Sequence, residues 1–231
     1  MGKALIGCVK RWLANMRISI LCTDQNHPVV RRLQEWDADM TKEGHSITVI
    51  YDKALLAGGD ILFLVSCSQI IGVEERNKYK ATMVLHASDL PRGRGWSPYI
   101  WEVLNGENQL TVSLLEASEP IDSGAVCLKT SFLLEGHELL TEINEKVFDA
   151  ELYLMTQMVE RFDNIKSTPQ AGEPGSYMRK RTPADSRLDP DKSIAEQFDL
   201  LRVVDSQRYP AFFDYRGKRY LIKIEKDNYE Q

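Results

Sequence analysis

Two residues with acid–base side chains, His86 and Asp122, each follow an apolar run in this 231-residue chain. His86 lies near the end of ATMVLHAS, and Asp122 lies in the loop EASEPIDSG that follows LTVSLL. A carboxylate beside an imidazole fixes its tautomer and favours its protonated form, so the pair predicts proton transfer to or from a bound substrate. Each residue also fits a structural role: His86 as a buried histidine with satisfied hydrogen bonds, and Asp122 as a turn residue.

A third polar cluster, SCSQ, contains Ser66, Ser68 and Gln69 and follows the apolar run that ends at residue 66. In an open α/β sheet, ligands bind outside the carboxyl ends of the strands. We therefore expect the SCSQ segment, the His86 loop and the Asp122 loop to converge. A plain polar strand exit explains SCSQ equally well.

The elements that must position these loops follow from the hydrophobic pattern. Nearly continuous apolar runs predict buried strands, and apolar residues three or four apart predict helices. The pattern predicts strands over 16–22, 46–51, 60–66, 81–88, 110–117 and 127–134, and helices over 27–40, 74–80, 97–106, 137–162 and 191–205. The last helix should turn Ile194, Phe198, Leu201 and Val204 inward, and Arg216-Gly217-Lys218 predicts a hairpin turn.

The order of these elements predicts an α/β fold: a Rossmann-like, doubly wound, mostly parallel sheet with a short C-terminal helix-plus-hairpin extension. We divide the chain into a catalytic domain over 16–166 and an extension over 167–231 that begins in a loop rich in Pro and Gly. Residues 1–15 carry an apolar run shorter than a signal-peptide core, followed by Lys10-Arg11. They are either an N-terminal extension or the product of an upstream start, with Met16 as the natural beginning.

The composition excludes several classes of protein. With 29 Lys+Arg against 34 Asp+Glu, the net charge is -5, which argues against binding nucleic acid mainly through its phosphates. The four cysteines are widely spaced and form no zinc-ligand pattern, so we expect neither a metal nor a disulfide framework. No apolar run is long enough for a membrane span, and we expect a cytoplasmic protein.

The segment from His86 to Gly124 resembles the N10-formyltetrahydrofolate-dependent formyltransferases. The matching features are His86-Ala87-Ser88-Asp89-Leu90-Pro91, the loop from Gly95 to Pro98, and Asp122-Ser123-Gly124, and the likeness runs from Met16 to about Phe162. The resemblance implies formyl transfer from N10-formyltetrahydrofolate to an amine, with His86 in proton transfer and Asp122 orienting it. For the folate co-substrate we expect contacts from Ser66, Ser68, Gln69, Leu115 and Glu116.

The sequence departs from this family at Val84, where the family has an Asn that donates to the carbonyl oxygen. Losing one such donor costs about 3 kcal/mol of transition-state stabilisation. Three explanations remain open. A polar group of Ser66, Ser68 or Gln69 replaces the donor, protonated His86 does so itself, or the protein is a weak or silent relative that binds folate or nucleotide. We favour replacement.

The C-terminal segment resembles the sugar-nucleotide N-formyltransferases, and the whole chain is most similar to small members associated with pseudaminic-acid-type pathways. The resemblance implies a UDP-linked 4-amino-4,6-dideoxy hexosamine as acceptor. We expect Arg92, Arg94, Arg181 and Tyr209 to bind it, although a charged loop can simply be solvated. Another small amine is the alternative, whereas length and charge disfavour a tRNA acceptor. The hairpin 211–224 leaves a homodimer open.

Overall fold

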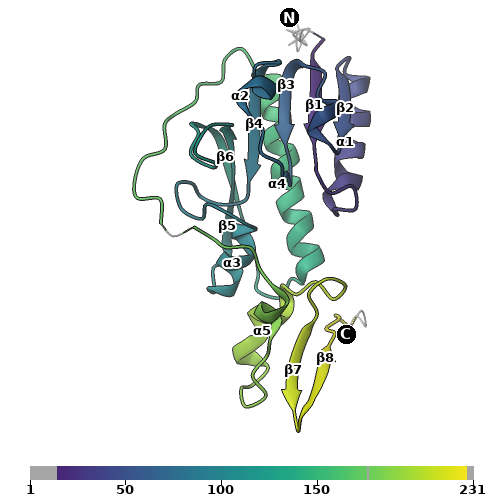
Figure 1. Cartoon of the computed structure of the whole chain (residues 1–231), viewed down its shortest axis with the longest axis vertical. Helices are drawn as coiled ribbons and strands as arrows, with labels where there is room; N and C mark the ends of the chain where they lie inside the picture. Colours follow the sequence, from purple (N-terminus) through teal and green to yellow (C-terminus); the bar gives the residue numbers. More distant parts are fainter. Residues whose placement is uncertain (1–14, 176, 228–231) are drawn as a thin grey trace, which may run out of the picture.

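The computed structural model describes residues 15–175 and 177–227, so the expectation for residues 1–15 lies almost wholly outside the described residues. A six-stranded sheet has the order β2-β1-β3-β4-β5-β6 (Figure 1). The first four strands of this order are parallel, β5 runs antiparallel to its neighbours β4 and β6, and β6 therefore runs in the direction of the first four. Their bounds are β1 Arg17–Leu21, β2 Ser46–Ile50, β3 Gly59–Leu64, β4 Tyr79–His86, β5 Gln109–Glu116 and β6 Val126–Leu133. The predicted α/β, mostly parallel fold is confirmed.

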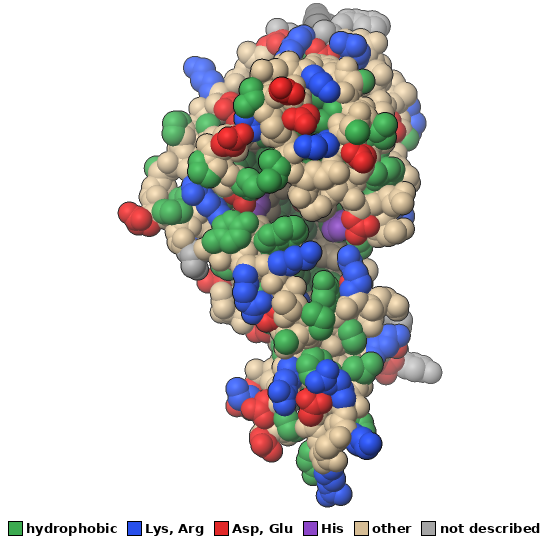
Figure 2. Space-filling view, in the orientation of Figure 1, with side chains coloured by type: hydrophobic (Ala, Val, Ile, Leu, Met, Phe, Trp, Pro, Cys, Tyr) green, Lys and Arg blue, Asp and Glu red, His purple; other side chains and the backbone are tan. Residues whose placement is uncertain are grey.

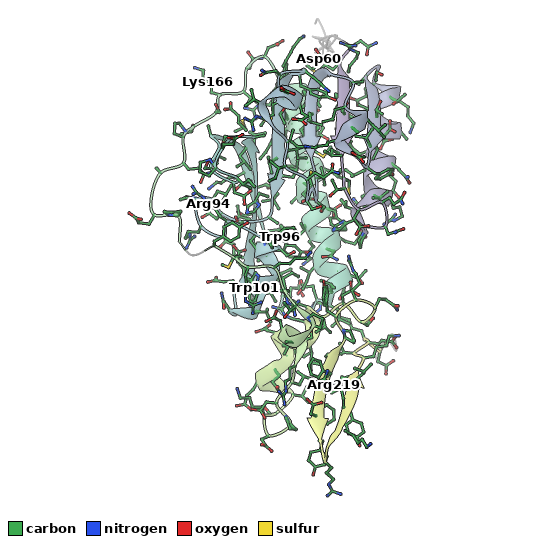
Figure 3. The ribbon with its side chains drawn as sticks, viewed as in Figure 1. Asp60, Arg94, Trp96, Trp101, Lys166 and Arg219 are labelled. Atoms are coloured by element: carbon green, nitrogen blue, oxygen red, sulfur yellow. The ribbon has the colours of Figure 1, made fainter. Side chains whose placement is uncertain are left out.

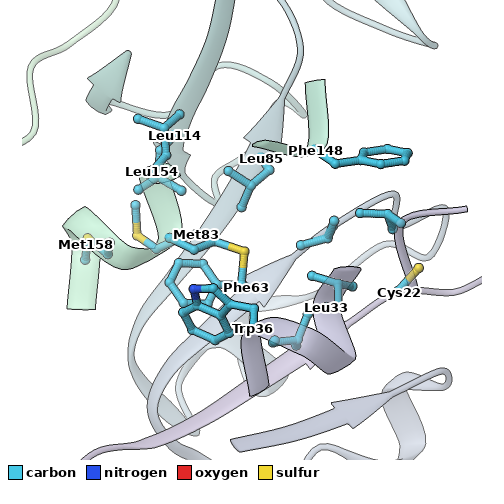
Figure 4. Close-up of a cluster of buried hydrophobic side chains, with 14 of the residues drawn as sticks. Cys22, Leu33, Trp36, Phe63, Met83, Leu85, Leu114, Phe148, Leu154 and Met158 are labelled. Carbon is cyan, nitrogen blue, oxygen red and sulfur yellow. The ribbon is translucent and has the colours of Figure 1, made fainter. Parts of the chain in front are cut away.

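Two long helices, α1 (Val29–Lys42) and α4 (Leu140–Glu160), pack on one face of the sheet. The core between them is shown in Figure 4, where Trp36 of α1 meets Phe63 of β3 edge to face, with ring centroids 6.2 Å apart. The Trp36 indole also donates a hydrogen bond of 2.9 Å to Thr156 of α4. The opposite face is covered more thinly, by the 3-10 turn η1 (Lys53–Leu55) and the single-turn α2 (Val73–Arg76).

The register of β4 and β5 determines where the Asp122 loop begins. Because the two strands are antiparallel, Glu116 lies opposite Met83 rather than beside His86. The loop after β5 therefore starts beside the middle of β4 rather than at the expected end of the sheet. Met83 is three residues from His86, which is about 10 Å of strand, so the loop is long enough to bring Asp122 back to the imidazole.

The extension contains η2 (Pro183–Ser186), η3 (Ala195–Gln197), α5 (Phe198–Arg202) and the hairpin β7 (Ala211–Tyr215) with β8 (Lys218–Ile222). The hairpin is as predicted, with Arg216 and Gly217 at positive φ in the turn. The predicted helix over 191–205 is wrong in its first half, and Ile194 is 73% exposed. Here the side chain of Gln197 hydrogen-bonds Asp189 and neighbouring carbonyls, and such local bonds compete with the helix.

The α4 residue Glu151 is buried at the sheet-facing side of the helix, and its Oε2 has no hydrogen-bond partner among the described residues. Burial raises the pKa of this carboxyl from 4.5 to about 8. The folded state therefore binds a proton that the unfolded state has released, so stability falls as the pH rises from about 4.5 to about 8.

Glu151→Gln should remove this pH dependence, because the neutral amide has nearly the same shape as the protonated carboxyl. We expect the variant to gain about 2–4 kcal/mol over the wild type between pH 5 and pH 8. Urea denaturation of both proteins across this range measures the difference. Two stability curves that stay parallel would show that Glu151 is ionised throughout.

Candidate active site

His86 is the last residue of β4 and is buried. Its Nε2 lies 2.8 Å from the carbonyl oxygen of Gly93. A carbonyl can only accept, so Nε2 carries the proton and Nδ1 is the bare nitrogen in the neutral ring. Nδ1 faces Oδ1 of Asp122 at 3.7 Å, beyond hydrogen-bond distance, and each of these two side chains is 8% exposed. The Gly93 carbonyl, which the sequence did not indicate, thus orients the ring.

Asp122 is held by a hydrogen bond to its carboxylate and by the close packing of its turn. Its backbone has φ of +59°, and its Oδ2 accepts a hydrogen bond of 3.0 Å from the amide of Gly95. The turn then continues through Gly124, where a Cβ would lie 1.8 Å from the carbonyl oxygen of Glu116. Only Gly fits there, so close packing against the end of β5 fixes the turn that presents the carboxylate.

The loop between His86 and Gly95 is tied down by its own contacts. The Ser88 hydroxyl donates to the carbonyl of Arg92 at 2.9 Å, and the Ser113 hydroxyl of β5 donates to the Ser88 carbonyl at 2.7 Å. The arrangement gives a proton-accepting nitrogen and a carboxylate that face each other across a short gap. Such a pair can take a proton from an attacking nucleophile and stabilise the resulting imidazolium.

The SCSQ segment lies at the end of β3 against the end of β1. The Ser68 hydroxyl shares a hydrogen bond of 2.9 Å with the hydroxyl of Thr23, and the Gln69 side chain accepts from the Lys53 amide at 2.9 Å. The Ser66 hydroxyl has no hydrogen-bond partner among the described residues. Thr23 also donates to the Ser66 backbone carbonyl at 3.4 Å, so Ser66 and Ser68 are both tied to the loop after β1. Among the described residues, no hydrogen bond joins Ser66, Ser68 or Gln69 to the His86 or Asp122 loop.

Leu115 and Glu116 differ in exposure: Leu115 is buried, whereas Glu116 is exposed at the end of β5. Val84 pairs in register with Leu115 on one side and Leu64 of β3 on the other. The Val84 side chain packs against the buried apolar cluster that contains Leu21, Leu62 and Leu64. The position of the family's Asn is therefore apolar in its surroundings as well as in its residue type.

The structure separates the four residues expected to bind the acceptor. Arg92 is on the surface and pairs with Asp89, whereas Arg94 donates to the Gln170 side chain at 2.9 Å. Arg181 lies at the base of the extension, where its guanidinium contacts the carbonyl of Val203 at 3.3 Å and has no carboxylate partner among the described residues. Burial lowers the pKa of Arg181 below its usual range.

Tyr209, the fourth, lies near Arg181, because the Ser186 hydroxyl contacts both: it donates to the Tyr209 carbonyl at 3.0 Å and accepts from Arg181 at 3.4 Å. The preceding residue, Arg208, joins the extension to the loop after β1 through an ion pair of 3.7 Å with Asp24. These contacts bring the extension to the sheet end that carries His86.

A basic and aromatic patch that the sequence did not single out lies beside the Asp122 loop. Trp96 directly follows Gly95 and is 40% exposed, with the ammonium of Lys180 4.9 Å from its ring centroid. Figure 3 shows Trp96 and Trp101 between the sheet and the C-terminal hairpin, with Arg94 farther up, beside the sheet. Figure 2 shows a hollow in the molecular surface at the level of these residues, and histidine side chains are visible in it. The hollow thus has cationic and aromatic side chains at its edge.

The His86 imidazole and the Asp122 carboxylate thus face each other at the end of a mostly parallel sheet, an arrangement that can carry out proton transfer. Residues 16–159 match the family model described as formyl transferase, and the chain belongs to this family. It is a formyltransferase, and the formyl donor of the family is N10-formyltetrahydrofolate.

Three solved structures illustrate the likeness of fold. A methionyl-tRNA formyltransferase from Clostridium thermocellum is 22% identical with a TM-score of 0.77, and the match covers 93% of this chain and 95% of that one. HypX from Aquifex aeolicus, in complex with tetrahydrofolic acid, is 24% identical with a TM-score of 0.77, over 91% of this chain and 38% of that one. A sugar N-formyltransferase from Shewanella sp. is 18% identical with a TM-score of 0.70, over 93% and 99%.

These likenesses do not show which acceptor the protein uses, because a methionyl-tRNA formyltransferase and a sugar N-formyltransferase both match this chain almost end to end. Length therefore does not exclude a tRNA acceptor, and the acceptor must be argued from the site. Within the described ranges, no helix has the length and apolarity needed to cross a bilayer. Nor do these ranges bring three or more His, Cys, Asp or Glu side chains together as metal ligands.

Proposed function

We propose that the protein transfers a formyl group from N10-formyltetrahydrofolate to the amino group of a nucleotide-linked amino-deoxy sugar. The observation that carries the catalytic part is the buried gap of 3.7 Å between Nδ1 of His86 and Oδ1 of Asp122. Because Nε2 is occupied by the Gly93 carbonyl, Nδ1 is the nitrogen that exchanges protons with the substrates.

In the proposed reaction, the acceptor amine attacks the formyl carbon and forms the new C–N bond. His86 accepts the proton that the amine loses and delivers it to N10 as the bond between the formyl carbon and N10 breaks. Asp122 stabilises the imidazolium while it carries that proton. The products are tetrahydrofolate and the formamide, and no covalent enzyme intermediate forms.

The carbonyl oxygen gains negative charge during the attack, and Val84 offers it no donor. We propose that Ser66 supplies the hydrogen bond, since its hydroxyl has no partner among the described residues and the Ser68 hydroxyl already bonds that of Thr23. The Gln69 oxygen accepts from the Lys53 amide, so the amide nitrogen of Gln69 is the alternative donor. Leu115 and Glu116 remain the proposed contacts for the folate, on the strand that pairs with β4.

The proposed acceptor is a UDP-4-amino-4,6-dideoxy hexosamine of a pseudaminic-acid-type pathway. A nucleoside diphosphate needs cations and a platform for its base. Among the described residues, Arg181 and Lys180 are cations without a carboxylate partner, and Trp96 beside Lys180 provides the platform. Arg94 and Tyr209 complete the proposed set, whereas Arg92, paired with Asp89, is its outermost member. The support for this choice is the set of cationic and aromatic side chains, because proteins of similar fold include both a methionyl-tRNA formyltransferase and a sugar N-formyltransferase.

A panel of amines tests the acceptor. Incubation with N10-formyltetrahydrofolate should yield a product heavier by one formyl group from UDP-linked amino sugars, and none from initiator methionyl-tRNA. Arg181→Met should raise KM for the sugar nucleotide about tenfold or more with little change in kcat, because binding is lost uniformly. Formylation of the tRNA alone would overturn the proposed acceptor.

A second candidate function, that of a silent folate- or nucleotide-binding relative, is favoured by Val84 and its apolar surroundings. Val84→Asn separates the two. If Ser66 supplies the donor, Val84→Asn should change kcat less than tenfold, whereas Ser66→Ala should lower it about 10²-fold. A gain of 10²-fold or more in Val84→Asn, measured by formyl transfer, would instead identify the natural protein as the silent relative.

A further inference from the structure

A residue outside the recognised motifs, Gln170, contacts the catalytic loop directly. Its side-chain Nε2 lies 2.8 Å from the carbonyl oxygen of Asp122 and 2.9 Å from that of Gly124, and donates to both. Its Oε1 accepts from the guanidinium of Arg94 at 2.9 Å. Both amide protons and the amide oxygen are thus used, and all three bonds go to the two loops that flank His86.

The chain delivers Gln170 to this place by a short antiparallel pairing. Thr168 and Val126, the first residue of β6, exchange two backbone hydrogen bonds of 2.8 and 2.9 Å. Pro169 then restricts the backbone before Gln170. The side chain is half-buried, and its position is set by the sheet rather than by a mobile loop.

The geometry points to Gln170 as a positioning residue for Asp122, an inference that rests on the proposed role of the His86–Asp122 pair. Asp122 has φ of +59°, which is unfavourable for a residue with a side chain, so the turn needs external support. Gly95 holds the carboxylate at Oδ2, and Gln170 holds the carbonyl of the same residue. With Oδ1 3.7 Å from the imidazole, a shift of the turn by less than 1 Å would change the interaction between the two groups.

Gln170 also couples this turn to Arg94, because one amide bridges them. A neutral amide is the side chain that suits both partners: it donates to two carbonyls and accepts from a cation. Glutamate has the same shape but lacks the donors, so Gln170→Glu keeps the contact with Arg94 and loses both bonds to the turn. Glutamate also adds a negative charge beside the turn, so its effect must be compared with that of a neutral substitution.

The test is a double-mutant cycle on kcat for formyl transfer. Gln170→Glu should lower kcat about 10–100-fold, with KM for the folate within about threefold of the wild type. In the Asp122→Ala background, the same substitution should lower kcat less than twofold, because the carboxylate it positions is gone. Gln170→Met, which removes all three bonds, should behave in the same way. Gln157→Glu, on α4, where the Gln157 side chain bonds Glu160, is the matched control and should keep full activity.

The outcomes distinguish this inference from the proposed function. Equal losses from Gln170→Glu with and without Asp122 would overturn the positioning role and leave the His86–Asp122 site intact, as would a rise in KM with unchanged kcat. Full activity of Asp122→Ala would overturn the catalytic pair itself and the role of Gln170 with it. Thermal melts of each variant show that the compared proteins are folded.

Discussion

Replacing His86 with Gln should lower kcat for formyl transfer by about 10²–10⁴-fold, the usual contribution of a positioned acid–base group. The Gln amide can still donate to the Gly93 carbonyl, which His86 contacts at 2.8 Å, so the loop keeps its tie to β4. What the variant lacks is the proton-accepting Nδ1 that faces Asp122. The loss should therefore be in kcat, with folate binding and thermal stability nearly unchanged.

The matched control for this variant is His137→Gln. His137 is on the surface, where it contacts Glu135 and Lys226, and lies outside the proposed site. Its replacement should leave kcat unchanged. A His86→Gln enzyme with wild-type kcat would contradict the proposed proton transfer by His86.

Gly124→Ala should produce the second large effect. A Cβ at this position would lie 1.8 Å from the Glu116 carbonyl oxygen, which belongs to the backbone at the end of β5 and cannot rotate away. The Asp122 turn or the strand end must move instead. We expect kcat to fall about 10²-fold, because displacing a catalytic group by about 1 Å has effects of that size. The free energy of unfolding should fall by about 1–3 kcal/mol.

Gly72→Ala provides the comparison for Gly124→Ala. A Cβ at Gly72 would meet only the carboxylate end of Glu75, at 2.9 Å, and this flexible side chain can turn aside. Kinetic and urea-denaturation measurements on both variants should show losses for Gly124→Ala alone. Normal kcat in Gly124→Ala would mean that the turn adapts and that its close packing does not position Asp122.

Much of the fold follows from the sequence because the core strands are almost continuously apolar and α4 carries its apolar residues at regular spacing. Two features do not follow. The antiparallel direction of β5 has no signature in its own residues, since a strand buried on both faces shows the same pattern in either direction. The missing start of the helix over 191–205 depends on side-chain bonds of Gln197 that compete with helix formation.

The sequence also predicted some residues of the candidate site and missed others. The sequence indicated His86 and Asp122, and the structure brings the two side chains together in a buried gap, although by a different loop path. It did not indicate Gly93 or Gln170, because a backbone carbonyl and a single Gln in a Pro- and Gly-rich loop carry no pattern of their own. Gln170 lies in the C-terminal extension, yet its bonds are to the loop that carries Asp122 and to Arg94.

The most direct measurement of the central claim is the stoichiometry of transfer. The wild type and His86→Gln are incubated with N10-formyltetrahydrofolate and a UDP-linked 4-amino sugar, and tetrahydrofolate and formylated sugar are quantified together. We predict equal amounts of the two products from the wild type, and a rate at least about 10²-fold lower from His86→Gln. Tetrahydrofolate released without formylated amine, or equal rates from the two proteins, would contradict the account.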